Sequence, residues 1–316
     1  MQHENIFIGV DVAKAELVVA LPGLKPKAVA NTPQDIQQWL QNLPPGASIA
    51  MESTGRYHGQ LANLARQAGF KVYVLNARDV FFHARSLGVR GKTDRLDCEV
   101  IADYMEKHHD ELREWAGNDT VYSELTELLN CRATIAKHKA AMRQALKGIK
   151  GLQAPATLVQ QQLEQFLQQI DAQVDRLIAS DAQLAQGCAR LRTIKGIGPQ
   201  GAALLGALFS RFEFANSDAL VAFAGLDPRP NDSGAKRGRR RLTKRGPALL
   251  RRQMWLAGFA ATRSTALKPL YASLRARGLA TTEAIVVLAR KLLRVAFAVW
   301  RGTESFDAKR IGPAIA

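Results

Sequence analysis

Two hydrophobic periods divide this sequence and limit the folds that it can adopt. Between residues 5 and 115, apolar residues alternate with others at the two-residue period of a strand, as in the run from Ile6 to Val12. Between residues 119 and 190, apolar residues recur every three or four positions, which is the spacing of one face of a helix. The pattern therefore predicts an α/β part followed by a helical part.

The first part is predicted to contain alternating strands and helices. A short turn after Val12 joins two apolar runs and predicts a hairpin. A helix is expected to begin at Pro33, behind the cap residue Thr32, and to end before Pro44. The predicted strands are 6–12, 16–21, 48–51 and 71–75, and the predicted helices are 33–42, 57–67 and 93–107, the last capped by Thr93.

The second part is predicted to be helical throughout. Two long amphipathic helices, broken near 148–155, indicate an antiparallel hairpin that serves as a spacer or as a dimer interface. Further helices are expected at 199–209, 247–263 and 281–300, with a basic loop at 233–246. The expected domains are 1–115, 116–190 and 191–316.

The net charge lies entirely in the last part of the chain. The 316 residues carry 44 Lys and Arg against 28 Asp and Glu, a formal charge of +16. Residues 1–190 contain 21 basic and 21 acidic side chains, whereas residues 191–316 contain 23 basic and 7 acidic ones. This imbalance predicts a polyanion, DNA or RNA, held mainly by the C-terminal part. A hydrophobic content of 47% excludes wholesale disorder.

Simple features exclude several other classes of protein. The three cysteines, Cys98, Cys131 and Cys188, are odd in number and far apart, so neither a disulfide framework nor a zinc site is expected. Acidic residues among the first 19 positions argue against a signal peptide. Charged residues interrupt each long apolar run, so no membrane span is expected. A reducing cytoplasm fits this pattern.

Four carboxylates stand out by their positions. Asp11 lies inside an apolar strand, which is a costly place for a charge unless it is paired or binds a cation. Glu52 follows the strand 48–51, and Asp94 and Asp97 are three residues apart on one face of a predicted helix. Such an oxygen-rich cluster suits Mg²⁺, or Mn²⁺, and two ions could clamp the attacking and leaving oxygens of a phosphodiester. Taken singly, Asp11 also fits a turn former, and the helical pair also fits a solvated face.

The last part contains two candidate nucleic-acid contacts. Gly196-Ile197-Gly198 before a helix fits a helix–hairpin–helix turn that meets a phosphate, and it equally fits a plain turn. The segment from Ser233 to Gly246 has seven Lys or Arg among fourteen residues. No histidine lies near Ser233 as a base, so chemistry alone favours a turn residue there. The predicted nucleic-acid-binding residues are Lys195, Lys236, Arg237, Arg239, Arg240, Arg241, Lys244 and Arg245.

Several motifs together resemble one family. The chain contains, in order, Ile8-Gly-Val-Asp-Val-Ala-Lys14, Met51-Glu-Ser-Thr-Gly55, Gly91-Lys-Thr-Asp-Arg-Leu-Asp97, and the runs 191–198, 223–229 and 233–246. This combination spans nearly the whole chain. It resembles the DEDD transposases of bacterial insertion sequences, which are bridge-RNA-guided recombinases related to the Piv invertases.

The resemblance implies a RuvC-like domain of RNase H type, a coiled-coil dimerisation hairpin and a helical transposase domain. It implies that Asp11, Glu52, Asp94 and Asp97 bind Mg²⁺, and that Ser233 is the nucleophile that forms a covalent phosphoserine link to DNA. The family assembles its site from the acidic domain of one protomer and the serine domain of another, which implies a dimer, and a tetramer in the synaptic complex. In the RNA-guided members of the family, a non-coding RNA encoded by the element pairs with donor and target DNA, and the resemblance implies such an RNA here.

A metal site and a serine nucleophile would have complementary roles in this reaction. A hydroxyl needs a base or a metal to become a good nucleophile, and a covalent intermediate keeps the phosphoester energy, so strands can rejoin without ATP. The leading hypothesis is a Mg²⁺-dependent transposase in the bacterial cytoplasm, associated with the nucleoid. The alternatives are a protein-only invertase, a RuvC-type Holliday-junction nuclease and a non-catalytic nucleic-acid-binding protein. Ser217 is the alternative nucleophile.

Overall fold

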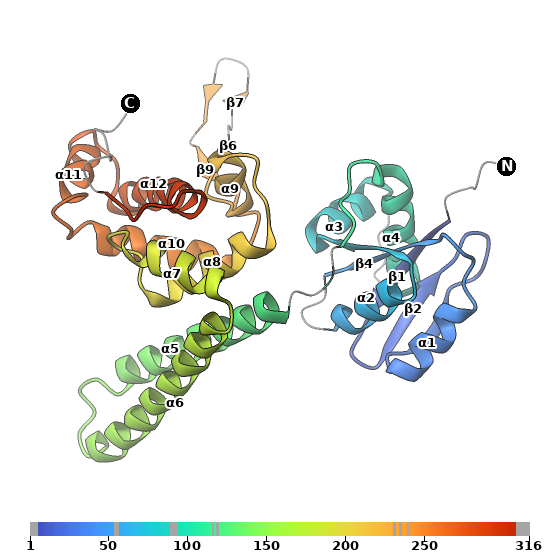
Figure 1. The fold of residues 1–316 in the computed structure, drawn as a ribbon, viewed down its shortest axis with the longest axis horizontal. Helices are drawn as coiled ribbons and strands as arrows, with labels where there is room; N and C mark the ends of the chain where they lie inside the picture. Colours follow the sequence, from blue (N-terminus) through green and yellow to red (C-terminus); the bar gives the residue numbers. More distant parts are fainter. Residues whose placement is uncertain are drawn as a thin grey trace. The chain divides into compact units, whose positions relative to one another are not determined.

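The computed structural model divides into two compact units, Met1–Asn118 and Asp119–Ala316, each of which is described by itself (Figure 1). The described residues are 6–53, 57–88, 94–115, 117, 120–229, 232–233, 236–238 and 240–307. Only the backbone is described for Asp94, Thr120, Asp232, Lys236 and Arg237. The division into domains with separate roles at residues 115 and 190 stays a prediction.

The first unit is built around a five-stranded mixed sheet with the strand order β3-β2-β1-β4-β5. Its strands are β1 Phe7–Val12, β2 Glu16–Ala20, β3 Lys27–Ala30, β4 Ser48–Glu52 and β5 Lys71–Leu75. β1, β2 and β3 are antiparallel neighbours, whereas β4 and β5 run parallel to β1. The predicted hairpin and strands are confirmed. β3 is an addition that the pattern did not predict, because its residues are mostly exposed.

Helices cover both faces of this sheet. They are α1 Pro33–Gln41, α2 His58–Gln67, α3 Ala77–Ser86 and α4 Asp94–His108. Ile36 of α1 packs with Ile49 on one face, and Ile101 of α4 packs with Val80 of α3 on the other. The three predicted helices are confirmed, and Thr93, the predicted cap of α4, lies outside the described residues. α3 was not predicted, because Val80 is its single buried residue.

The second unit begins with a long helical hairpin. It consists of α5 (Thr120–Ala145) and α6 (Gln153–Ala179). Arg132 donates a hydrogen bond from Nη2 to Asp171 at 2.9 Å, and Lys139 pairs with Glu164, so residues further along α5 meet residues earlier on α6. The predicted antiparallel hairpin is therefore confirmed, whereas its role in dimerisation stays a prediction.

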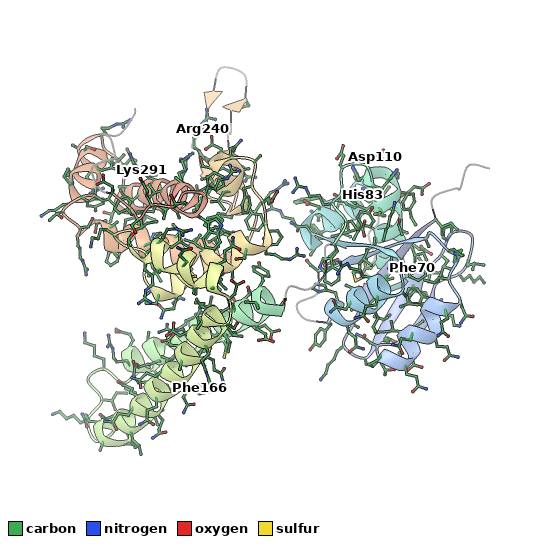
Figure 2. The ribbon with its side chains drawn as sticks, viewed as in Figure 1. Phe70, His83, Asp110, Phe166, Arg240 and Lys291 are labelled. Atoms are coloured by element: carbon green, nitrogen blue, oxygen red, sulfur yellow. The ribbon has the colours of Figure 1, made fainter. Side chains whose placement is uncertain are left out.

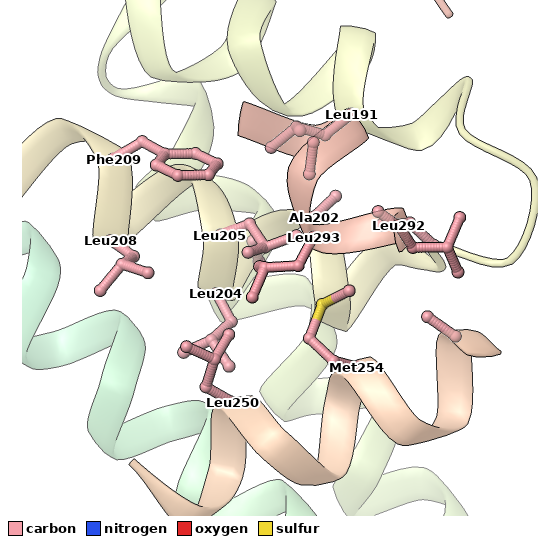
Figure 3. Close-up of a cluster of buried hydrophobic side chains, with 14 of the residues drawn as sticks. Leu191, Ala202, Leu204, Leu205, Leu208, Phe209, Leu250, Met254, Leu292 and Leu293 are labelled. Carbon is pink, nitrogen blue, oxygen red and sulfur yellow. The ribbon is translucent and has the colours of Figure 1, made fainter. Parts of the chain in front are cut away.

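The rest of the second unit packs around α8. The helices are α7 Ala182–Arg192, α8 Pro199–Arg211, α9 Ser217–Phe223, α10 Ala248–Ala261, α11 Lys268–Ala276 and α12 Thr281–Arg301. Leu205 of α8, Met254 of α10 and Leu293 of α12 belong to one buried cluster, which also includes Ile170 of α6 (Figure 3). Across the described ranges, no helix combines the length and the apolar character needed to cross a membrane.

A two-stranded ribbon leaves this helical body between α9 and α10 (Figure 1). Its strands are β6 Pro228–Arg229, β7 Asp232–Ser233, β8 Lys236–Arg237 and β9 Arg241–Leu242. β6 pairs with β9 and β7 pairs with β8, both antiparallel. The segment predicted as a loop at 233–246 thus contains strands. Backbone hydrogen bonds hold these short strands together. Their side chains are largely charged, so the segment lacks the alternation of apolar and polar residues from which a strand is predicted.

Candidate active site

Two of the four predicted carboxylates end neighbouring parallel strands. β1 and β4 pair in the register that places Val10 beside Met51, and the same register continued by one step places Asp11 beside Glu52. Side chains alternate along a strand, so both carboxylates share the sheet face of Gly9. Both residues are partly exposed. They lie at the carboxyl ends of the parallel strands, the edge at which ligands bind in open α/β sheets.

Helix α4 presses closely on this face. A Cβ atom added to Gly9 would lie 2.1 Å from the backbone oxygen of Cys98 and 2.5 Å from the backbone nitrogen of Ala102. Only glycine allows a helix backbone to approach a strand so closely. The motif glycine therefore sets the distance between α4 and the strand that carries Asp11.

The direction of α4 brings its acidic first turn to the same edge. At the start of β1, the ring of Phe7 contacts the ring of His109, just beyond the end of α4, with centroids 4.9 Å apart. The helix therefore runs antiparallel to β1, and its first turn lies toward Asp11. Asp94 begins that turn, and Asp97 follows it with a partly exposed side chain.

The thiol of Cys98 responds to the charge at this edge. Burial, the charge of Glu99 and the charge of Asp11 raise the pKa of Cys98 to about 11. The thiol is therefore protonated near neutral pH, and its Sγ donates a hydrogen bond to the backbone oxygen of Arg95 at 3.1 Å. Because the thiolate is the nucleophile and the metal ligand of cysteine, Cys98 fits neither role.

The ligand atoms that the site offers suit a hard cation. Asp11, Glu52 and Asp97 offer carboxylate oxygens, which are the ligands that Mg²⁺ prefers. Within the described part of the chain, no three such groups gather closely enough to hold a metal ion. The fourth predicted ligand, Asp94, has its side chain outside that part. The residues therefore fit the predicted metal in kind, and the ligand set itself stays a prediction.

Replacing Gly9 by Ala is expected to lower the free energy of unfolding by about 3 kcal/mol, because the new Cβ would overlap the backbone of α4. Urea denaturation followed by circular dichroism measures this change. Gly201→Ala on α8 is the matched control, since its Cβ would meet only Ile197 at an ordinary 3.5 Å. That control should be neutral or slightly stabilising. An unchanged midpoint for Gly9→Ala would contradict the close packing of α4.

The predicted nucleophile belongs to the second unit. Ser233 lies on β7, is exposed, and pairs across the ribbon with Lys236 of β8. The carboxylates belong to the first unit, so the two halves of the predicted site are carried by separately packed parts of the chain. The role of Ser233 stays a prediction.

The turn after α9 anchors the ribbon to the helical core. The backbone N–H of Thr243 donates to the backbone oxygen of Asp227 at 3.0 Å, and that of Lys244 donates to Gly225 at 3.1 Å. Gly225 has a φ of +64°, and a Cβ there would lie 2.1 Å from the backbone oxygen of Arg245. In the sequence, residues 223–229 stood out only as a family motif. Its glycine and aspartate position the base of the basic ribbon.

The predicted nucleic-acid contacts lie on the ribbon and in the segment after it, apart from Lys195, which lies in the turn between α7 and α8. Five of them have exposed side chains: Lys195, Arg240, Arg241, Lys244 and Arg245. Lys236 and Arg237 lie on β8 with only their backbone described, and Arg239 lies outside the described residues. Figure 2 shows Arg240 at the foot of the ribbon. The placement agrees with a basic surface, and contact with nucleic acid stays a prediction.

The predicted glycine turn joins α7 to α8. Gly196 has a φ of +105°, and its Cβ would lie 2.5 Å from the backbone oxygen of Ala257 on α10. Gly198 precedes Pro199 at the start of α8, and a Cβ there would meet nothing within 4 Å. The turn between two helices is confirmed, with one side packed on α10 and the other side open.

Comparison with known families accounts for both units. Residues 8–150 match a family of DEDD transposases of the IS110 type, described as "Transposase". Residues 188–272 match a family described as "Transposase IS116/IS110/IS902 family". The resemblance that the sequence motifs indicated is therefore confirmed over more than two thirds of the chain.

Similar proteins include two curated relatives and one solved structure. The pilin gene-inverting protein of Moraxella bovis is 29% identical over an alignment of 274 residues that covers 83% of this chain and 82% of the relative. That of Moraxella lacunata is 28% identical over the same shares. A structure of T. thermophilus RuvC in complex with a Holliday junction substrate covers 35% of this chain and 100% of its own, with 14% identity and a TM-score of 0.28. A TM-score this low carries no argument about the fold.

The family matches follow the order of the motifs along the chain. The first match contains the strands that carry Asp11 and Glu52 and the helix whose first turn is acidic, and the second contains the glycine turn and the basic ribbon. The two relatives match across both regions. The chain therefore belongs to the IS110 family of transposases and is a DNA transposase or recombinase.

Proposed function

We propose that this enzyme cuts and rejoins the DNA of a mobile insertion sequence at a divalent-metal site, with Ser233 as its nucleophile and a non-coding RNA as its guide. One observation carries the proposal: Asp11 and Glu52 lie toward the carboxyl ends of neighbouring parallel strands, and the acidic first turn of α4 lies toward the same edge, inside the DEDD family match. The sheet order and the helices on both faces support a RuvC-like domain of RNase H type.

Asp11, Glu52, Asp94 and Asp97 would hold Mg²⁺, or Mn²⁺. Bound ions of this kind polarise a phosphate and activate a hydroxyl. The role of the protein fold is to position these carboxylate ligands. Two adjacent strand ends fix the first two carboxylates, and the contact of α4 with Gly9 fixes the turn that carries the other two.

Ser233 would attack the phosphorus of a DNA strand through its Oγ. The hydroxyl loses its proton, the bond from phosphorus to the leaving sugar oxygen breaks, and that oxygen takes up a proton. The product is a phosphoserine ester, and attack by the hydroxyl of the strand to be joined releases the serine unchanged. Exposure of Ser233 on a basic ribbon supports this role, because a phosphate can reach it among neutralising cations.

The proposal includes particular partners. Donor and target DNA would be held by the basic segment, and an element-encoded RNA would pair with both. The α5–α6 hairpin would join two protomers, with a tetramer in the synaptic complex, and the acidic domain of one protomer would serve Ser233 of another. The enzyme would work in the bacterial cytoplasm at the nucleoid. The relatives named for pilin gene inversion support a role in DNA rearrangement.

Metal removal separates this proposal from hydrolysis by a RuvC-type nuclease. Protein purified together with the element-encoded RNA, incubated with labelled DNA carrying the end of the element, is expected to form a covalent protein–DNA adduct that survives a denaturing gel. EDTA should lower the adduct by at least about 100-fold, and added Mg²⁺ should restore it. Adduct that persists in EDTA would contradict the metal site.

The same gel separates two other outcomes. Cleaved DNA without any adduct would indicate hydrolysis rather than a serine intermediate. Strand exchange that survives RNase treatment of the protein would indicate a protein-only invertase instead of an RNA-guided enzyme.

A further inference from the structure

The basic stretch continues well beyond the ribbon. Residues 233–282 contain thirteen Lys and Arg and no Asp or Glu. Seven of the thirteen lie between Ser233 and Gly246, and the other six lie on α10, on α11 and in the turns beside them. A surface of one charge that extends onto a further helix indicates a polyanion contact in addition to the ribbon.

Helix α10 has one packed face and one open face. Gly258 lies against α12, where a Cβ would be 2.7 Å from the backbone oxygen of Ile285, and Ala257 lies against Gly196 of the glycine turn. The side chains of the open face form a helical stripe at spacings of four, three and four. This stripe consists of Arg252, Leu256, Phe259 and Arg263, all of them exposed.

Aromatic rings and arginines lie together on the open face. The rings of Trp255 and Phe259 are stacked with planes 3° apart and centroids 5.5 Å apart. The guanidinium of Arg263 lies 5.0 Å from the centroid of the Phe259 ring. Phe259 is 38% exposed and Leu256 is 40% exposed. Exposed rings beside arginines are the surface on which nucleobases stack.

A cavity of about 230 Å³ adjoins this stripe between α10 and the glycine turn. Ile197, Met254 and Leu256 supply apolar walls, and Gln200 and Gln253 supply amides. Pockets for drug-sized ligands measure roughly 300–1,000 Å³, so this cavity suits a group no larger than one base. An amide can both donate and accept hydrogen bonds, as the edge of a base requires.

We propose that the open face of α10 and this cavity bind an unpaired segment of nucleic acid. A base would stack on Phe259 in place of the Arg263 guanidinium, and Arg263 would then pair with a neighbouring phosphate, as would Arg252. Duplex bases stack on one another and hide their faces, so the aromatic part of this surface selects an unpaired strand. The inference rests on the proposed handling of DNA and RNA, and it adds a second surface to that of the ribbon.

Fluorescence anisotropy with labelled oligonucleotides tests this surface in the full-length protein. Phe259→Leu keeps an apolar side chain and removes the ring. We expect it to weaken binding of single-stranded DNA or RNA by about 5- to 150-fold, because base–aromatic stacking has that strength. Binding of a blunt duplex should change little. Comparing the DNA and RNA strands tells which of them occupies the site.

The controls use other exposed rings of the chain. Phe82→Leu on α3 removes a ring that is 47% exposed outside the basic stretch and should leave all binding unchanged. Phe259→Trp keeps an aromatic ring at this position and should bind single strands about as well as the unsubstituted protein. In the unsubstituted protein, addition of single strands should quench tryptophan emission, and Trp255→Phe should remove most of that quenching. This last measurement does not require a variant at Phe259 to fold.

Three outcomes would overturn the inference: equal losses for duplex and single strands, no loss with Phe259→Leu, or altered self-association with unchanged nucleic-acid binding. The last would indicate a protein interface. The anisotropy assay measures binding and does not depend on the covalent adduct. A negative result in this assay therefore leaves the adduct test of the proposed function intact. Failure of the adduct test likewise leaves the α10 binding result standing.

Discussion

Replacing Asp11 by Asn should lower DNA cleavage and joining by at least about 100-fold while leaving the first unit folded, because it removes a proposed direct ligand of the metal. Asp11 is partly exposed on β1, and Asn has nearly the same size and shape as Asp. The substitution should therefore change the metal-free melting temperature little. Excision and insertion in cells measure the activity.

A second readout separates metal binding from a merely structural effect. A ligand that binds only the folded state raises the melting temperature, so Mg²⁺ should stabilise the unsubstituted protein and fail to stabilise Asp11→Asn. Glu106→Gln, an exposed acidic residue on α4, is the matched control and should keep both activity and the Mg²⁺ effect. Full activity in Asp11→Asn would sink the metal-site proposal.

The sheet edge could be predicted from sequence because its parts carry strong local signals. An acidic residue inside the apolar run of β1 is costly unless it is paired or binds a cation, and a second acidic residue ends β4. Parallel strands place their carboxyl ends at one edge, so a prediction of strands also predicts where Asp11 and Glu52 meet. Gly9 was quoted as part of a motif, and only the structure shows that it lets α4 press against β1.

The second unit was predicted less completely, because tertiary contacts decide more of it. The ribbon strands are two residues each and consist largely of charged residues, so no apolar alternation predicts them. The open face of α10 could not be predicted from the sequence for a related reason. Apolar residues occur all around that helix, and the pattern alone does not tell that Phe259 stays exposed while Met254 is buried.

Replacing Ser233 by Ala should abolish both the covalent adduct and strand joining, because the substitution removes the proposed attacking oxygen. Ser233 is exposed, so the free energy of unfolding should change by less than about 0.5 kcal/mol. DNA binding and the Mg²⁺-dependent rise in melting temperature should both persist, since the basic side chains and the carboxylates are untouched. Adduct gels and melting curves on one preparation measure these effects together.

Ser217 supplies the decisive comparison. It begins α9 behind the cap Asn216, whose side chain accepts hydrogen bonds from the backbone of Asp218 and Ala219. Its hydroxyl is not the capping group, so Ser217→Ala should fold and remain active. An adduct that survives in Ser233→Ala and disappears in Ser217→Ala would move the nucleophile to α9 while leaving the metal site in place. Loss of the adduct in Ser233→Ala alone would assign the covalent chemistry to the ribbon, where exposure and surrounding positive charge let a DNA phosphate approach.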